Sequence, residues 1–109
     1  MAALSTSVVP RGGLAVEPVA AAGGGDTCQT GAGVVLLVRN GDESSHTVTL
    51  VTPGTVNGLA IADRAVTVAA GDEVLIPVTS EYYNPSTGRA NITYDGVTDL
   101  TVAVIRVPS

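Results

Sequence analysis

Apolar and polar residues follow a period of two along most of the chain after residue 30. A continuous apolar run, VVLLV at residues 34–38, is followed by HTVTLVT at 46–52, where threonine and aliphatic residues alternate. The same alternation occurs in EVLIPV at 73–78, ANITYD at 90–95 and DLTVAVIRV at 99–107, and AVTVA at 65–69 is a further short segment of this kind. This period predicts β-strands that bury one face.

Turn signals between these segments predict how the strands are joined. Asn40-Gly41 ends the first run, so we expect a hairpin between residues 34–38 and 46–52, with residues 40–45 as its loop. Residues 65–69 and 73–78 form a second expected pair, joined by Ala70-Gly71-Asp72. Pro77 has no backbone N–H to donate, which places its strand at a sheet edge or near its end.

Together these segments predict the fold class. About seven or eight short strands at roughly ten-residue spacing, with no long helix, are typical of an antiparallel β-sandwich or jelly roll. One of them is a short strand expected near residues 59–62, between the turn signals Pro53-Gly54 and Asn57-Gly58. We expect each sheet to have one buried face and one solvent-facing side, with threonine at many of the solvent-facing positions.

Residues 1–30 differ from the rest, which divides the chain into an extended N-terminal arm (1–30) and a β-sandwich domain (31–109). Prolines and glycine runs in this segment prevent a long helix. A disordered terminus is the alternative, but disordered tails are usually more polar. We therefore expect the arm to pack against a partner's surface through Val8, Val9, Arg11, Leu14 and Val16.

Composition and charge exclude several classes of partner. The chain of 109 residues has no Phe or Trp and only three Tyr, so its core must be aliphatic, and association with copies of itself or a larger scaffold is expected to add stability. A net charge of −5 without any lysine argues against a nucleic-acid partner. No apolar stretch reaches the roughly 20 residues that span a bilayer, so no membrane partner is expected.

Groups that could perform catalysis or bind metal are scarce. His46 follows Asp42 and Ser44 closely, but residues so near in sequence rarely reach triad geometry, and we expect His46 at the solvated end of a hairpin. The carboxylate pairs Asp42-Glu43 and Asp72-Glu73 leave calcium as an alternative, without a calcium-loop spacing to support it. Cys28 is expected to be a small apolar filler. We therefore expect no enzyme, metal or cofactor.

The segment EYYNPSTGR at residues 81–89 is the remaining candidate site. Tyr82 and Tyr83 are adjacent in an extended segment, so one should point into the core and the other toward a partner. Asn84 begins a turn, and Arg89 is expected either to pair with Glu81 or to bind a partner's carboxylate. The alternative is an ordinary connection between strands.

Several pieces of the chain carry a resemblance through their order and spacing. They are GDT at 25–27, Gly31, LLVRNG at 36–41, TVTLVTP at 47–53, DRAVTVAAGDEVLIPV at 63–78, YYNPSTGRANITY at 82–94 and TVAVIRV at 101–107. In this order they resemble a group of small structural proteins of tailed bacteriophages, especially those that infect actinobacteria. The resemblance covers most of the chain after the N-terminal arm.

The resemblance implies a virion structural protein, a capsid decoration protein that binds the outer surface of the phage head and stabilises the shell. It would be made in the host cytoplasm, and its partners would be the major capsid protein and copies of itself, in a trimer or another homo-oligomer. Two alternatives stay open: a neck or tail connector component, and a β-sandwich module that binds carbohydrate or a cell surface.

Overall fold

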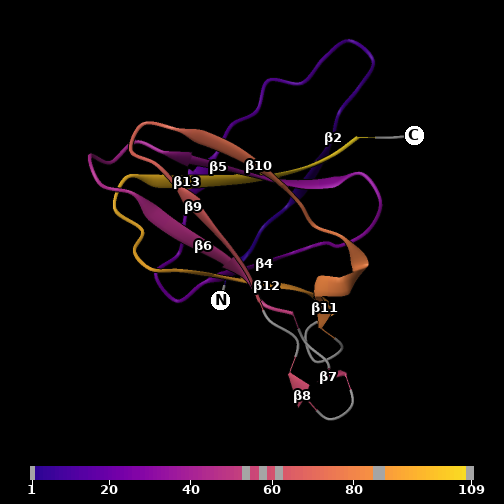
Figure 1. Ribbon diagram of the computed structural model, residues 1–109. Coiled ribbons are helices and arrows are strands. Elements are labelled where there is room, and N and C mark those ends of the chain that lie inside the picture. Colours follow the sequence, from indigo (N-terminus) through magenta and orange to yellow (C-terminus); the bar gives the residue numbers. More distant parts are fainter. Residues whose placement is uncertain (1, 53–54, 57–58, 61–62, 85–87, 108–109) are drawn as a thin grey trace.

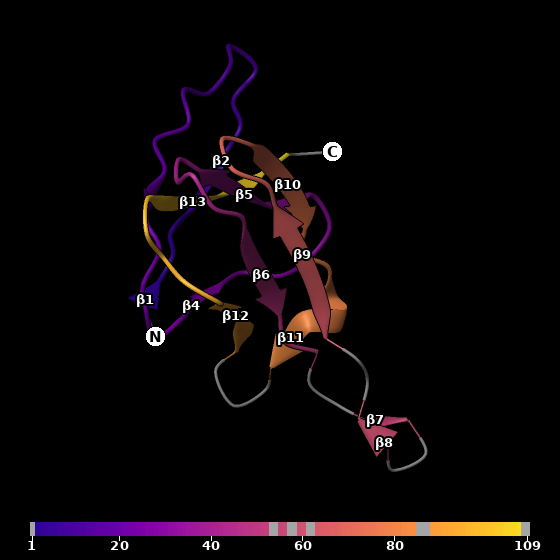
Figure 2. The same ribbon diagram turned by 60° about the vertical axis from the view of Figure 1, so that its left-hand side comes forward.

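The strands stack in two sheets, as Figures 1 and 2 show for a computed structural model that describes residues 2–52, 55–56, 59–60, 63–84 and 88–107. The described elements are β1 (Ala2–Ala3), β2 (Thr6–Val8), β3 (Val19–Ala20), β4 (Asp26–Cys28), β5 (Val34–Asn40), β6 (His46–Leu50), β7 (Thr55–Val56), β8 (Leu59–Ala60), β9 (Arg64–Val68), β10 (Glu73–Pro77), a 3-10 turn η1 (Ser80–Tyr82), β11 (Tyr83–Asn84), β12 (Arg89–Tyr94) and β13 (Leu100–Arg106). The predicted all-β sandwich is confirmed.

Each sheet is named here after one of its interior strands. The β6 sheet has the strand order β1-β4-β12-β6-β9, with β11 also paired to β12. The β5 sheet has the order β10-β5-β13-β2, with β3 also paired to β13. Two pairings, β1 with β4 and β2 with β13, are parallel, and the others are antiparallel. The small ribbon of β7 and β8 projects from the sandwich (Figure 1).

Consecutive strands change sheet at most connections, which overturns both predicted hairpins. β5 pairs with β10 and β13 instead of β6, and β9 pairs with β6 instead of β10. The connections β5 to β6, β9 to β10 and β12 to β13 all cross from one sheet to the other. The edge position predicted from Pro77 is confirmed, because β10 is the outermost strand of the β5 sheet.

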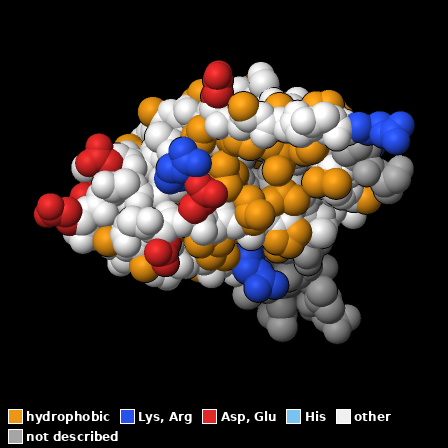
Figure 3. All heavy atoms as spheres, turned by 90° about the horizontal axis from the view of Figure 1, so that it is seen from above, with side chains coloured by type: hydrophobic (Ala, Val, Ile, Leu, Met, Phe, Trp, Pro, Cys, Tyr) orange, Lys and Arg blue, Asp and Glu red, His pale blue; other side chains and the backbone are white. Residues whose placement is uncertain are grey.

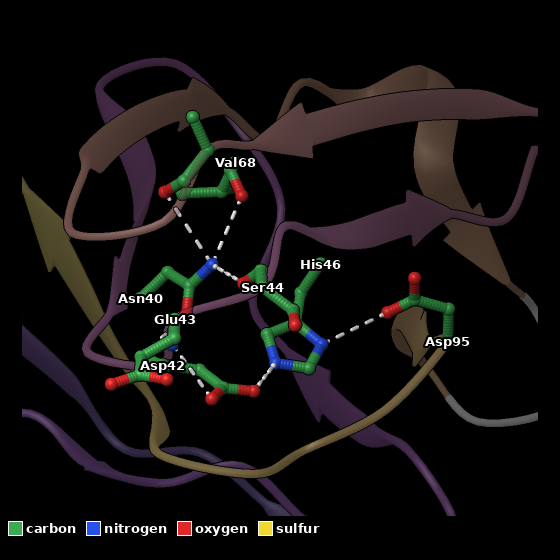
Figure 4. A network of polar contacts seen from close by, with 8 residues as sticks. Asn40, Asp42, Glu43, Ser44, His46, Val68 and Asp95 are labelled. Carbon is green, nitrogen blue, oxygen red and sulfur yellow. Dashed lines mark hydrogen bonds and ion pairs between the residues drawn. The ribbon is translucent and has the colours of Figure 1, made fainter.

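The buried side chain of Asn40 explains why Asn-Gly does not make a hairpin turn here. Its Nδ2 donates to the carbonyl oxygens of Ser44 at 2.9 Å and Val68 at 3.0 Å, and its Oδ1 accepts the N–H of Asp42 at 2.9 Å (Figure 4). Ser44 lies in the β5–β6 connection, whereas Val68 ends β9 in the other sheet. The side-chain amide of Asn40 therefore links the end of β5 to two connections that cross between the sheets.

The first 30 residues lie in the same sandwich as the rest, in contrast to the separate arm predicted for residues 1–30. All three residues of β4 are buried, and Leu4, Ala21 and Cys28 belong to the hydrophobic core. Short extended pieces between the prolines and glycines complete the edges of both sheets. What projects is residues 9–18, between β2 and β3, which rise beyond the outer side of the β5 sheet (Figures 1 and 2).

The core between the sheets is aliphatic, as the composition predicted. Fully or almost fully buried side chains from both sheets fill it, among them Leu36, Val38, Val48, Leu50, Ile92, Leu100, Val102 and Val104. Tyr82, at 5% exposure, is the aromatic side chain of this described core, and Tyr94 packs against it while partly buried. Each strand of the core thus places alternate residues inward.

Replacing Asn40 with Ala should lower the free energy of unfolding by about 2–4 kcal/mol, because it leaves buried carbonyl groups without their donor. Urea unfolding of the purified protein measures this loss. Ser44→Ala is the matched control, since Ser44 contributes only its backbone carbonyl to the network. The control should change stability by less than about 0.5 kcal/mol. Equal effects of the two variants would contradict the role given to Asn40.

Candidate interaction surfaces

The predicted contact residues of the N-terminal segment take two different positions. Val8 is 53% exposed, Val9 is half-buried and Arg11 is exposed. Leu14 and Val16 are half-buried and line a hollow against β13 instead of facing outward. The segment therefore offers Val8 and Arg11 to a partner, while Leu14 and Val16 form one wall of the hollow.

In the 81–89 segment the structure separates the two adjacent tyrosines. Tyr82 is 5% exposed and belongs to the core, whereas Tyr83 is 47% exposed, which confirms that one points inward and the other outward. Asn84 is half-buried and accepts the N–H of Gly88 at 2.7 Å through its backbone carbonyl. Residues 85–87, where the turn was predicted, lie outside the described part of the chain.

Arg89 holds the N-terminal segment in place. Its Nη2 donates to the carbonyl of Leu4, and its Nε donates to Oγ1 of Thr27 at 3.2 Å. The guanidinium therefore links β12 to two segments that lie more than 60 residues earlier in the chain. These contacts favour a structural role for Arg89. Its predicted pairing with Glu81 concerns a side chain outside the described set.

The exposed candidates gather at one end of the sandwich, which we call the basic end. Val8 pairs with Arg106 in the β5 sheet, and Tyr83 pairs with the start of β12 in the β6 sheet. Arg64 begins β9 at this end and Val107, at 52% exposure, follows β13. Asp63 also lies here. Exposed apolar side chains and arginines thus share one end of the molecule.

The opposite end carries acidic residues, and we call it the acidic end. Backbone hydrogen bonds bring Asp72 and Asp99 to Asn40 and Gly41, beside the loop that contains Asp42 and Glu43. Figure 3 shows most acidic side chains toward the left, with a basic side chain among them, and further basic side chains at the right end and lower edge. The chain is therefore polarised along its strands, a feature that net charge alone does not reveal.

The outer face of the β5 sheet is the largest departure from the sequence prediction. In register across β10, β5 and β13 lie the rows Pro77–Val35–Ile105, Leu75–Leu37–Ala103 and Glu73–Arg39–Thr101. The first two rows are apolar throughout, and we call these six side chains the apolar face. The third row is polar and contains the ion pair of Arg39 with Glu73 at 2.7 Å.

Exposure and packing show that the apolar face points away from the core. Leu75 is 60% exposed, and Leu37 is buried without being part of the core between the sheets. Figure 3 looks down on this side and shows hydrophobic side chains in one continuous area. The signal in the sequence was the unbroken run VVLLV, since strands covered on both faces lack polar alternation.

The outer face of the β6 sheet has the opposite character. Its register places Thr49 between Ala65 and Thr93, and Thr47 beside Thr67. These side chains are exposed or half-buried, as the alternating threonines predicted. The expectation of an outer side rich in threonine therefore holds for the β6 sheet and is wrong for the β5 sheet, whose outer side is apolar over two of its three rows.

A hollow of about 360 Å³ lies beside the apolar face. Its floor includes Ala103 and Ile105 of β13, and its wall includes Leu14 and Val16 of the projecting segment. The wall rises on the side of the sheet opposite β10, because β2 and β3 both pair with β13. The surface is therefore walled at the β13 side and open at the β10 side.

His46 joins two loops at the acidic end, and the prediction that it is solvated is wrong. It is 7% exposed, with Nε2 at 3.0 Å from Asp42 Oδ2 and Nδ1 at 3.3 Å from Asp95 Oδ1 (Figure 4). Burial disfavours the charged imidazole, but hydrogen bonds and charge from both aspartates outweigh it and raise the pKa of His46. Both ring nitrogens face carboxylates, which does not match a serine triad.

A second polar cluster lies inside the sandwich. Asp26 is 1% exposed; its Oδ2 accepts the Tyr94 hydroxyl at 2.6 Å, and its Oδ1 finds no hydrogen-bond partner among the described residues. Cys28 is fully buried, and burial raises the pKa of its thiol to about 11. Such a thiol is a poor nucleophile, in keeping with the apolar filler predicted.

The described residues contain neither a metal-binding cluster nor a membrane-spanning helix. No group of three His, Cys, Asp or Glu side chains comes together there in a way that could hold a metal ion. None of the described helices is long and apolar enough to cross a membrane.

The His46 bridge should make stability depend on pH. Because the pKa of His46 is raised above its ordinary value of 6.5, its contribution is full below pH 6.5 and is lost as pH rises through the raised pKa. His46→Gln should therefore lower the urea midpoint more at about pH 5.5 than at about pH 9. Thr67→Ala is the control, and an equal loss for His46→Gln at both pH values would contradict this role.

The two tyrosines offer a matched pair of substitutions. Tyr82→Ala should lower the free energy of unfolding by about 3–5 kcal/mol, because it empties a core position. Tyr83→Ala should change it by less than about 1 kcal/mol, since the side chain is half exposed. Thermal or urea unfolding measures both changes. A similar loss for the two variants would mean that the segment is only a connection between strands.

Comparisons with known proteins give no further guide. No family model, curated protein or solved structure matches the chain. The resemblance to phage structural proteins therefore stays a prediction.

Proposed function

We propose that the protein is a structural protein of a phage particle, a decoration protein that binds the outer surface of the head and stabilises the shell. The observation that carries the proposal is the basic end, where the exposed apolar side chains Val8, Tyr83 and Val107 lie with Arg64 and Arg106. Apolar anchors with arginine are the usual composition of a protein interface.

Strand order supports a jelly roll, the finer fold that the sequence predicted. The strands β3, β13, β5 and β10 form one sheet, β4, β12, β6 and β9 form the other, and the chain crosses between them at every step except β6 to β9. This connectivity supports the proposal of a jelly roll, a fold used by viral capsid domains and also by lectins. The fold alone is an analogy and does not assign the function.

Polarity along the strands supports attachment by one end. If the basic end meets the shell, the acidic end and its crossing loops point into solvent, where charge keeps particles apart. The major capsid protein would be the partner at the basic end. Many copies on one shell can bind with modest affinity each and still reinforce it.

Copy number in purified particles tests the proposal. A decoration protein should be present at a level comparable to the major capsid protein, which quantitative mass spectrometry of the virion measures. About a dozen copies or fewer would indicate a ring at the neck or tail and would contradict decoration. An absence from the particle would contradict any virion role, including the connector alternative.

A double substitution tests whether the basic end is the surface that binds the shell. Val8→Glu combined with Tyr83→Glu should lower binding to heads that lack the protein by at least about tenfold, because two apolar anchors are lost. Co-sedimentation with such heads measures the change. Thr67→Glu, on the polar outer face of the β6 sheet, is the control and should bind as the unchanged protein does.

A further inference from the structure

The apolar face carries a projecting side chain at its open side. Leu75 is the most exposed large hydrophobic side chain described, at 60%, and it lies on the edge strand β10. In its row it is followed by Leu37 and then by the small side chain of Ala103. The row therefore runs from a large projecting residue to a small one.

The hollow lies at the other side of the same face. Apolar side chains bound it below, at Ala103 and Ile105, and at the side, at Leu14 and Val16. Ser5, Ser7 and Glu17 also contribute to its lining, so the hollow is apolar in part. A volume of about 360 Å³ accommodates an aliphatic side chain together with part of the strand that carries it. One face thus holds both a projection and a matching recess.

We propose that this face docks a second copy of the chain, with Leu75 of each copy inserted into the hollow of the other. The inference rests on the proposed function in naming copies of the chain as neighbours on the shell. A two-fold axis that runs along β5 reverses the order of strands while keeping each row at its level. Leu75 of one copy then lies over Ala103 of the second, and the exchange is reciprocal.

The same two-fold axis places each of the two remaining rows against the same row of the second copy. Pro77–Val35–Ile105 meets the same apolar row of the second copy, so apolar side chains cover apolar side chains. Glu73–Arg39–Thr101 likewise meets its counterpart, which brings two arginines and two glutamates into one neutral cluster. The wall of each copy closes the open β10 side of the other. The shape of the face is thus self-complementary, and its polar row is neutral as a whole.

A two-fold axis perpendicular to the strands would bring opposite charges together, but it is excluded on steric grounds. It would place the acidic end of one copy over the basic end of the other, yet it would also bring both projecting walls to the same side of the interface. Stacked sheets lie only about 10 Å apart, which leaves no room for two walls. Overlap of atoms costs far more than repulsion between exposed charges screened over about 8 Å at physiological salt.

The small area of the interface predicts a weak association in solution. Three strands and three rows cover on the order of 300 Å² per copy, well below the roughly 800 Å² per partner of a standard interface. Dissociation constants of about 10–1,000 µM are therefore expected. Because the acidic ends of both copies point the same way, added salt should strengthen the dimer by screening their repulsion.

Analytical ultracentrifugation of the full chain, from about 10 µM to about 2 mM, tests the proposal. The unchanged protein should show a monomer–dimer equilibrium whose dissociation constant falls when salt is raised. Leu75→Glu should weaken dimerisation by at least about tenfold, because it buries a charge against the apolar side chains of Ala103 and Ile105. A protein that stays monomeric over the whole range would overturn the proposal.

Two further variants distinguish insertion of Leu75 into the hollow from non-specific hydrophobic association. Thr67→Glu adds the same charge to the outer face of the β6 sheet and should leave the dissociation constant unchanged. Ala103→Leu makes the face more apolar but fills the recess, so insertion predicts weaker dimerisation. Stronger dimerisation of Ala103→Leu would overturn the geometry. Circular dichroism and urea unfolding show whether each variant is folded before it is compared.

The outcome is distinguishable from a failure of the proposed function. Dimerisation is measured without any phage component, whereas decoration is measured by copy number and head binding. A dimer in solution with no protein in the particle would overturn only the virion role. If Leu75→Glu abolished head binding while the unchanged protein stayed monomeric, the face would belong to the shell contact, and the second-copy proposal would be overturned.

Discussion

The buried amide of Asn40 is the interaction on which the rest of the sandwich depends. It binds carbonyl groups of the β5–β6 connection and of β9, so it holds two sheets together at the point where the chain leaves one for the other. A buried donor of this kind is costly to leave unpaired, which favours one arrangement of the loops over its competitors. His46 reinforces the same end by joining the loops of Asp42 and Asp95.

Crossing between sheets has a consequence for the outer surfaces. In a hairpin, the two neighbouring strands share the same two faces, but here β5 and β6 belong to different sheets and meet different surroundings. The alternating threonines of β6 therefore line a polar exterior, while the unbroken apolar run of β5 gives its sheet an apolar exterior. The difference between the two faces follows from topology as much as from composition.

Local patterns in the sequence predicted the strands, the aliphatic core, the edge position of β10 and the opposite directions of Tyr82 and Tyr83. They did not predict which strands pair, because Asn40-Gly41 has the same local appearance in a hairpin turn and in a crossing loop. The role of Arg89 could not be predicted from local patterns either, since its partners Leu4 and Thr27 are distant in the chain. The apolar face had a signal in VVLLV, but the register of three strands was needed to assemble it.

An exposed apolar sheet face is a liability unless something covers it, since edges and faces of this kind promote aggregation. In this chain the edge strand is blunted by Pro77, and Arg39 with Glu73 form a polar row at one end of the face. These features restrict edge-to-edge pairing while leaving the face itself accessible. A wall on one side further limits the orientations in which another sheet can approach. The surface is therefore shaped for one closed arrangement rather than for open-ended stacking.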